Sequence, residues 1–215
     1  MKNQVAKDSL EKMHASLNEK LKHTMWGDFR LGDLFEINSS KKRFDANKVK
    51  LVVNSGHPYI VRTSRNNGQK GYIDEIENYL NEGNTISFGQ DTATFYYQKE
   101  PYFTGDKIKI LKPKFERFNE SNAQFILEAM RKSFQLFSWG TSSFNVSVIS
   151  NQKIQLPINQ TKEIDFDFME SFVYELEKMR ICELELERLN ELKAYLDVTG
   201  IKDLDCFQNT YRNME

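Results

Sequence analysis

The stretch RTSRNNGQKG, residues 62–71, is rich in side chains that donate hydrogen bonds and contains no acid. Arginine and asparagine can grip phosphate oxygens and base edges with two hydrogen bonds at once. This pattern favours an anionic, hydrogen-bonding partner, of which nucleic acid is the first to consider. The side chains available for such contacts are those of Arg62, Thr63, Arg65, Asn66, Asn67, Gln69 and Lys70. The same Asn-Asn-Gly run is also typical of a solvated turn with positive φ, which needs no partner.

Charge is distributed unevenly along the chain, although the net charge is only −1. Between residues 41 and 70, Asp45 is the single acid among many lysines and arginines, whereas residues 163–191 are rich in carboxylates. A local basic segment fits one binding face better than a general attraction to polyanions. The composition therefore leaves nucleic-acid binding open for one part of the chain.

The motifs of common catalytic sites are absent from the sequence. There is no Gly-rich phosphate loop ending in Gly-Lys-Ser/Thr, no G-x-G-x-x-G after a strand, and no Asn/Asp-Pro-Pro-aromatic element of an amino-methyltransferase. His14, His23 and His57 do not have metal-ligand spacing, and the nuclease-like Glu-x-Lys at 191–193 has no strand carboxylate before it. We therefore expect a protein that binds rather than catalyses, without a metal or a cofactor.

Cysteine usage and the N-terminal residues indicate the compartment. Cys182 and Cys206 encode neither a disulfide framework nor a zinc knuckle. The N-terminal residues contain no uninterrupted apolar segment of a signal peptide, and no window of 18 apolar residues occurs. We expect a cytoplasmic protein with reduced thiols.

The elements that must position the basic residues follow from hydrophobic periodicity. Apolar residues recur every three to four positions over 8–23, which predicts an amphipathic packing helix. Strands and turns are expected over FRLGDLFEI, PYIVRT, GNTISFG, ATFYYQ and FTGDKIKIL. Ser121 or Asn122 can cap a helix that runs to about Phe137, and FNVSVIS with KIQLPI is expected to form a closing strand pair. The fold class is thus α+β, with a β-rich mixed domain and its N-terminal helix over residues 1–158.

A long helix is expected after the polar linker INQTKEID. Residues 166–196 contain almost no helix breaker and would form a helix of about thirty residues, roughly 45 Å long. The apolar seam of this helix is too long to be buried against one compact domain, so we predict that a partner helix covers it. The alternative is a helix that lies across its own domain. The seam residues are Met169, Phe172, Leu176, Met179, Cys182, Leu186, Leu189 and Leu196. Residues 159–200 would then be a dimerisation or spacer helix ending near Gly200, and residues 201–215 a polar tail.

The order of these parts is itself informative. WGDFRLGDLFEI, HPYIVRTSRNNGQKG, GNTISFG, PYFTGDKIKIL, a helix before Trp139-Gly140, and KIQLPI leading into a long helix follow one another. This set resembles a DNA target-recognition domain of the specificity (S) subunits of restriction-modification systems. EIDFDFMESFVYELE and LKAYLDVTGIKDLD resemble the spacer helix and tail of half-length subunits of type I and type IIB-like, BcgI-type, systems. Full-length subunits resemble two such units in tandem, whereas this sequence has one of each and no internal repeat.

The resemblance implies a non-catalytic subunit that reads one half of a bipartite DNA target. It also implies docking of a methyltransferase subunit and, where present, a nuclease subunit. With a single recognition domain and a single spacer helix, two copies are expected to pair their long helices antiparallel about a twofold axis. The alternative partners for the seam are the methyltransferase subunit or a different half-subunit.

The resemblance also implies roles for single residues. Loop 62–71 would face the DNA, with Arg62 and Arg65 on guanine or phosphate and Asn66, Asn67 and Gln69 on base edges. Phosphates would be held by Lys41, Lys42, Arg43 and Lys48. A second candidate segment supplies Thr141, Ser142, Ser143 and Asn145, for which a polar turn is the plain alternative. Weaker candidates are Gln90, Thr92 and Thr94.

A rival hypothesis is a coiled-coil interaction module whose mixed domain binds a peptide or a protein. Its basic stretch would then only increase solubility. Salt dependence separates the two hypotheses, because binding through several phosphates weakens steeply with salt and an apolar groove barely responds.

Overall fold

The computed structural model describes residues 2–53, 55–135 and 144–200, and these form two compact units. Residues 24–173 form one, called here the recognition unit. Helix α1 (Lys2–His23) and the part of helix α5 (Phe166–Thr199) from Tyr174 onward form the other, the helical unit. These units differ from the expected ranges 1–158 and 159–200, because α1 pairs with α5 and the first turns of α5 pack into the recognition unit. The expected tail, 201–215, lies outside the described residues.

The described part of the recognition unit contains three sheets, and the α+β class expected from the sequence is confirmed. A two-stranded sheet pairs β1 (Met25–Arg30) with β9 (Lys153–Ile158), and a four-stranded sheet has the order β2 (Phe35–Ser39), β8 (Ile108–Pro113), β5 (Thr85–Gly89), β6 (Thr94–Gln98). The three-stranded sheet has the order β4 (Gln69–Ile73), β3 (His57–Ile60), β7 (Phe103–Thr104). Pairing is antiparallel except between β3 and β7. The helical elements are α2 (Leu31–Leu34), α3 (Glu120–Phe134), α4 (Val146–Asn151) and two 3₁₀ turns, η1 (Asn66–Gly68) and η2 (Glu77–Tyr79).

Most expected strands are confirmed, but FNVSVIS is a helix and that prediction is wrong. The Asn145 side chain accepts a hydrogen bond from the backbone N–H of Val148 at 2.9 Å, which caps helix α4. Ile149 on this helix is completely buried in the main core. Capping and core packing thus override the β-branched composition of the stretch. The partner of β9 is β1, with Trp26 opposite Pro157. The predicted strand FRLGDLFEI is likewise interrupted by α2.

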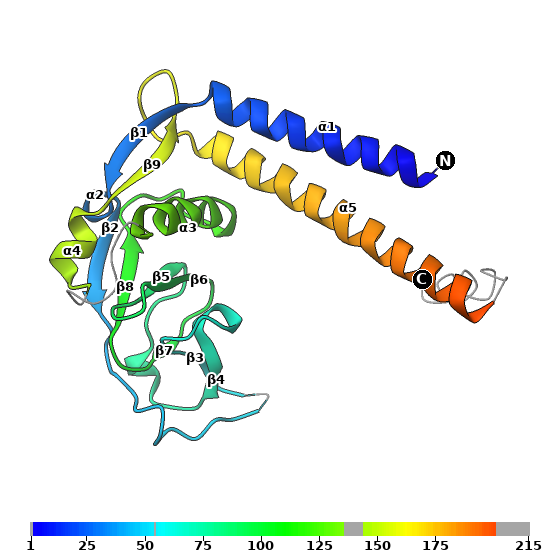
Figure 1. The fold of residues 1–215 in the computed structure, drawn as a ribbon. Coiled ribbons are helices and arrows are strands. Elements are labelled where there is room, and N and C mark those ends of the chain that lie inside the picture. Colours follow the sequence, from blue (N-terminus) through cyan, green and yellow to red (C-terminus); the bar gives the residue numbers. More distant parts are fainter. Residues whose placement is uncertain (1, 54, 136–143, 201–215) are drawn as a thin grey trace. The chain divides into compact units, whose positions relative to one another are not determined.

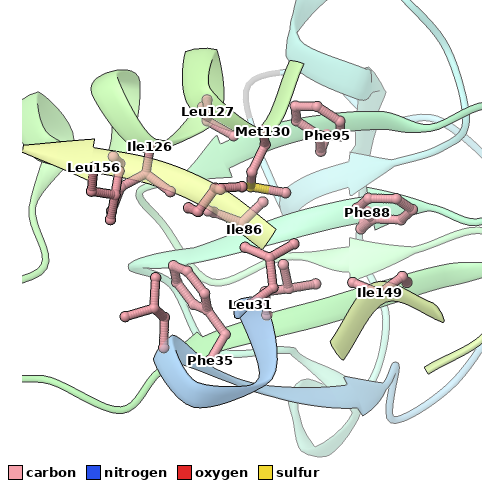
Figure 2. Packing of buried hydrophobic residues seen from close by; sticks show 14 of the residues in the cluster. Leu31, Phe35, Ile86, Phe88, Phe95, Ile126, Leu127, Met130, Ile149 and Leu156 are labelled. Carbon is pink, nitrogen blue, oxygen red and sulfur yellow. The ribbon is translucent and has the colours of Figure 1, made fainter. Parts of the chain in front are cut away.

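The main core lies between the four-stranded sheet and helix α3, with α2, α4 and β9 closing it (Figure 2). Strand β5 is buried along its whole length, as expected for a central strand covered on both faces. On it, Phe88 packs against Phe95 with ring centroids 5.6 Å apart and against Phe134 of α3 at 5.3 Å. The apolar side of α3 predicted from the sequence is confirmed by the burial of Ala123, Ile126, Met130 and Phe134. Phe137 lies outside the described residues.

A smaller core supports the three-stranded sheet, which carries the basic loop. Phe44, Tyr59, Ile73 and Phe103 are buried together there. The Tyr59 hydroxyl donates to the carbonyl oxygen of Phe44 at 2.7 Å, so this buried polar group is satisfied. Burial, with a smaller contribution from Asp45, raises the pKa of Tyr59 to about 12. Phe44 is anchored in this smaller core, and the basic segment Lys41–Arg43 directly precedes it in the chain.

A carboxylate network joins the start of α3 to the first turn of α5. Asn119, rather than the predicted Ser121 or Asn122, caps α3, and Asn122 completes the capping box. Glu170 of α5 accepts hydrogen bonds from Asn119 Nδ2 at 2.8 Å, from Asn122 Nδ2 at 3.2 Å and from Arg117 at 3.0 Å. Burial raises the pKa of Glu170, but these donors outweigh it and hold the pKa below its usual range.

In the helical unit, helix α1 is a partner helix for the apolar seam of α5. Helix α5 spans 34 residues, about 50 Å at 1.5 Å per residue, which confirms the predicted long helix. Helix α1 runs beside it (Figure 1), with His14 Nε2 2.9 Å from Glu183 and Lys20 Nζ 2.5 Å from Glu175. Since residue numbers rise along one helix as they fall along the other, the pair is antiparallel. Leu17 and Met179 are buried, each with 5% of its surface exposed. Part of the predicted seam is therefore covered by the same chain.

The end of α5 follows the local rule expected from the sequence. Gly200 has φ +69°, and its N–H donates to the carbonyl oxygen of Leu196 at 3.0 Å. Within residues 2–53, 55–135 and 144–200, every helix is too short or too polar to cross a membrane.

The network around Asn122 generates a stability prediction. Asn122 is completely buried, and its side chain also donates to Arg117 O at 2.6 Å and accepts from Asn119 N at 3.0 Å. We expect Asn122→Ala to lower the free energy of unfolding by about 1–3 kcal/mol, because buried polar groups lose their partners. Urea unfolding followed by circular dichroism measures this.

The matched control on the same helix is Glu128→Ala, which removes an exposed ion pair with Arg131 at 2.8 Å. Exposed pairs contribute little, so the control should unfold at the wild-type urea midpoint. Equal midpoints for Asn122→Ala and Glu128→Ala would show that the network does not stabilise the fold.

Candidate nucleic-acid interface

The backbone of loop 62–71 has a defined shape. Asn66, Asn67 and Gly68 have φ values of 46°, 50° and 79°, all in the left-handed region that asparagine and glycine tolerate best. Gly68 donates to Arg65 O at 3.0 Å and accepts from Val61 N at 2.8 Å. Gln98 of strand β6 donates to Asn67 O at 3.1 Å. The turn recognised in the sequence is therefore present, and hydrogen bonds to its backbone hold its shape.

The side chains of this loop fall into two groups. Arg65, Asn66 and Asn67 are exposed, and among the described residues the Arg65 guanidinium has no hydrogen-bond or ion-pair partner. Arg62 is instead held, its NH1 donating to Asp91 Oδ2 at 2.5 Å. Lys70 Nζ donates to Ala46 O at 2.9 Å. The inner contacts of the turn are those of Thr63 Oγ1 with Arg65 N at 3.3 Å and of Asn66 Nδ2 with Gln69 O at 3.4 Å.

A hollow of about 540 Å³ lies beside strands β2 and β8 and is lined mainly by cations. Its lining residues are Ser39, Ser40, Lys41, Lys42, Arg43, Gln90, Lys107, Ile108 and Lys109. Pairing of β2 with β8 sets Ser39 opposite Lys109, whose Nζ donates to Ser39 Oγ at 2.7 Å. The hollow thus brings the predicted Lys41–Arg43 segment together with residues more than sixty positions away.

Lys107 and Lys109 were not identified as site residues from the sequence. Lys109 alternates with the buried Ile108 and Ile110 on β8, so the local pattern indicates only a half-buried strand. The feature that places these lysines in the site is the pairing of β8 with the end of β2, where serines and lysines follow one another in the chain. That pairing is long-range and cannot be read from local periodicity.

The predicted phosphate-contacting cations already have weak partners on the surface. Lys42 Nζ lies 4.7 Å from the Phe44 ring centroid and 4.3 Å from that of Tyr79. Arg43 pairs with Asp106 at 3.1 Å, and Lys48 lies 3.8 Å from Asp45. Both ion pairs are well exposed, so each contributes little and can be exchanged for a phosphate at small cost.

Asp91 links the hollow to the loop. This residue lies between β5 and β6, and its Oδ2 accepts from Lys107 Nζ at 2.7 Å as well as from Arg62. Hydrogen bonding from Lys107, followed by the charges of Lys107 and Arg62, lowers the pKa of Asp91, so the group is an anion at neutral pH.

The second predicted segment contributes one described residue. Thr141, Ser142 and Ser143 lie outside the described residues, and Asn145 is exposed while its side-chain oxygen caps α4. The weaker candidates already have hydrogen-bond partners within the protein. Gln90 Nε2 donates to Phe144 O at 2.9 Å, and the hydroxyls of Thr92 and Thr94 are 2.8 Å apart.

Chemically, the arrangement can hold a polyanion and present hydrogen-bonding side chains beside it. Among the described residues, no group of His, Cys, Asp and Glu side chains is arranged to hold a metal ion.

Comparison with known proteins identifies related sequences and folds. Residues 24–186, more than half of the chain, match the family described as the type I restriction modification DNA specificity domain. The specificity subunit of the type II restriction enzyme BcgI from Heyndrickxia coagulans is 27% identical over 185 residues, which is 85% of this chain and 52% of that protein. The chain thus spans about half the length of this relative.

Two solved structures share the fold at low sequence identity. The type I restriction-modification S subunit from M. genitalium has a TM-score of 0.51 at 14% identity, covering 91% of this chain and 57% of that one. The HsdS subunit from Thermoanaerobacter tengcongensis has a TM-score of 0.55 at 12% identity, covering 86% of this chain and 48% of that one.

The geometry of the loop generates a prediction about Gly68. A Cβ at this position would lie 3.1 Å from Tyr96 Cδ2, at a φ of +79°. We expect Gly68→Ala to lower the free energy of unfolding by about 1–3 kcal/mol and to speed amide exchange in residues 65–69, because the left-handed conformation becomes strained. Hydrogen exchange and urea unfolding measure the two effects.

Gly71→Ala is the matched control in the adjoining strand. Gly71 does not have positive φ, and its Cβ would meet only the Leu51 side chain, at 3.2 Å. A loop equally protected in both variants would contradict the fixed shape assigned to it.

Proposed function

Because the chain belongs to the family of type I restriction modification DNA specificity domains, we propose that it reads one half of a bipartite DNA target for a restriction-modification system. The chain is a DNA-recognition component and not an enzyme, in keeping with this family. The rival hypothesis of a peptide-binding coiled-coil module has no support from the comparisons. The proposed role requires access to chromosomal DNA and hence a cytoplasmic location.

The observation that carries this proposal is the cationic hollow next to an exposed loop of fixed shape. Lys41, Lys42, Arg43 and Lys109 line the hollow together with Lys107, which is paired with Asp91. Cations at this density attract the DNA backbone through release of its counterions, which supplies affinity without sequence information. Base reading falls to the loop, whose Arg65, Asn66 and Asn67 side chains are exposed and rich in hydrogen-bond donors.

Within the loop, we assign base reading to Arg65, Asn66, Asn67 and Gln69. A base-reading side chain must extend into a groove, and the exposed guanidinium of Arg65, which has no partner among the described residues, suits a bidentate contact with guanine. Arg62 is less suited, since Asp91 already occupies its guanidinium. Lys48 and Lys70 would add phosphate contacts at the edge, and Thr63 supports the turn.

The proposed partners are duplex DNA, a methyltransferase subunit and, in some systems, a nuclease subunit. The relative from Heyndrickxia coagulans is named as a subunit of a restriction enzyme, which supports work within such an assembly. The chain would select the site and leave the chemistry to its partners, so we propose no cofactor for it.

The long helix is the proposed assembly surface. Of the predicted seam, Met169 and Met179 are buried within the chain, whereas Leu176 and Leu189 have 42% and 51% of their surfaces exposed. Exposed leucines on a charged helix favour association with another helix. We propose that two copies pair through this uncovered part about a twofold axis, which would place equal half-sites on opposite strands.

Two single substitutions test the division between base and phosphate contacts. The target is first found from the methylated sites in cells that express the chain with its methyltransferase. We expect Arg65→Ala to lose about 1–3 kcal/mol of discrimination between target and scrambled duplexes. Lys41→Ala should weaken both duplexes equally and reduce the salt slope by about 0.9, because one phosphate contact is lost. Lys41 is chosen because Lys42 also contacts two rings.

Competition binding at several salt concentrations measures both quantities. Equal losses on both duplexes for Arg65→Ala would remove base reading from the loop. Wild-type binding that does not respond to salt would contradict DNA recognition through the hollow.

Sedimentation of the free chain tests assembly. We expect a dimer at micromolar concentration that dissociates in the double variant Cys182→Glu with Leu189→Glu, since both positions are exposed and lie seven residues apart on the seam. The matched control is Tyr174→Glu with Ile181→Glu, at the same spacing on a different face of α5.

The two variants distinguish the alternatives. Dissociation by the control pair alone would place the dimer interface on that other face. A monomeric wild type would remove the homodimer and leave the seam for a different subunit.

A further inference from the structure

Asp91 occupies an unusual place in the candidate interface, because one of its oxygens neutralises two cations from different clusters. Oδ2 accepts from Arg62 of the loop at 2.5 Å and from Lys107 of the hollow at 2.7 Å. Both Arg62 and Asp91 have 31% of their side-chain surface exposed. The other interface pairs are looser, since Arg43 and Asp106 are more than half exposed at 3.1 Å.

The turn that carries Asp91 is held in place by its neighbours. A Cβ on Gly89 would lie 2.7 Å from Thr94 Oγ1 and 3.1 Å from Arg62 Cγ, so the backbone passes close to the arginine stem. The backbone N–H of Gln90 donates to Lys107 O at 3.0 Å. The backbone next to Asp91 is therefore held close to Arg62 and Lys107.

A carboxylate in this position makes the same charge-assisted hydrogen bonds that a DNA phosphate would make with these cations. A phosphate that takes these same donors must displace Asp91 from a pair with Arg62 that is two-thirds shielded from water. We propose that Asp91 is a positioning residue that withholds Arg62 and Lys107 from backbone phosphates and thereby limits non-specific DNA binding. This inference rests on the proposed function and concerns discrimination rather than affinity for the target.

The test measures binding of a short duplex of scrambled sequence, so it does not require the target to be known. Asp91→Asn should bind this duplex more tightly at low salt and with a steeper salt dependence. Each released cation adds about 0.9 to the slope, so affinity should fall about threefold more per cation between about 50 and 200 mM salt. Asp91→Glu, which retains the anion, should keep the wild-type slope.

Glu82→Gln controls for the change in net charge. Glu82 pairs with Lys112 at 2.7 Å, and neither residue lines the hollow or belongs to the loop. Its salt slope should equal that of the wild type. A steepening in Glu82→Gln equal to that in Asp91→Asn would reduce the effect to net charge and overturn the proposal.

Arg62→Gln provides a second test that does not alter Asp91. If the arginine is withheld, this variant keeps the wild-type salt slope on scrambled DNA. A slope lowered by about 0.9 would mean that Arg62 already contacts phosphate, which overturns the proposal. A wild-type protein that binds no duplex at any salt concentration would overturn the proposed function itself. Failure of the proposed function is thereby distinguished from failure of the Asp91 proposal, in which the wild type still binds DNA.

Discussion

The hydrogen-bond network around Glu170 is the interaction on which the recognition unit depends most. It satisfies the buried Asn122, completes the cap of α3 and holds the first turn of α5. Aromatic contacts enclose the same region, with Phe115 against Phe166 at 5.2 Å and Phe125 against Phe172 at 5.9 Å. The beginning of the long helix is consequently part of the core that supports the main sheet. A helix that looks like a separate spacer in the sequence is built into the domain that precedes it.

The positive and negative charges of this protein are concentrated in different parts of the chain. A chain with net charge −1 concentrates cations around one hollow and places many of its carboxylates on α5. Asp91 and Asp106 lie among those cations and moderate them to different degrees, according to exposure and to the number of partners. Such internal anions keep part of a strongly basic surface from attracting every polyanion that approaches it.

The two helices of the helical unit cover only part of the apolar seam of α5. Antiparallel pairing with α1 buries Met179 and is reinforced by contacts of His14 with Glu183 and of Lys20 with Glu175. Exposed pairs of this kind add orientation more than stability. The leucines that α1 leaves exposed, Leu176 and Leu189, are what makes further helix association reasonable.

Local patterns in the sequence determined most of the element types, the long helix with its end at Gly200, and the positive-φ turn at Asn66–Gly68. These features depend on neighbours within one or two turns, where periodicity, caps and glycine act directly. The tertiary structure decided the remainder. It made FNVSVIS a helix through the burial of Ile149, paired α1 with α5, and brought Lys107 and Lys109 to Lys41. It also placed Asp91 between Arg62 and Lys107, because such contacts join residues distant in sequence whose energies depend on packing that no local window contains.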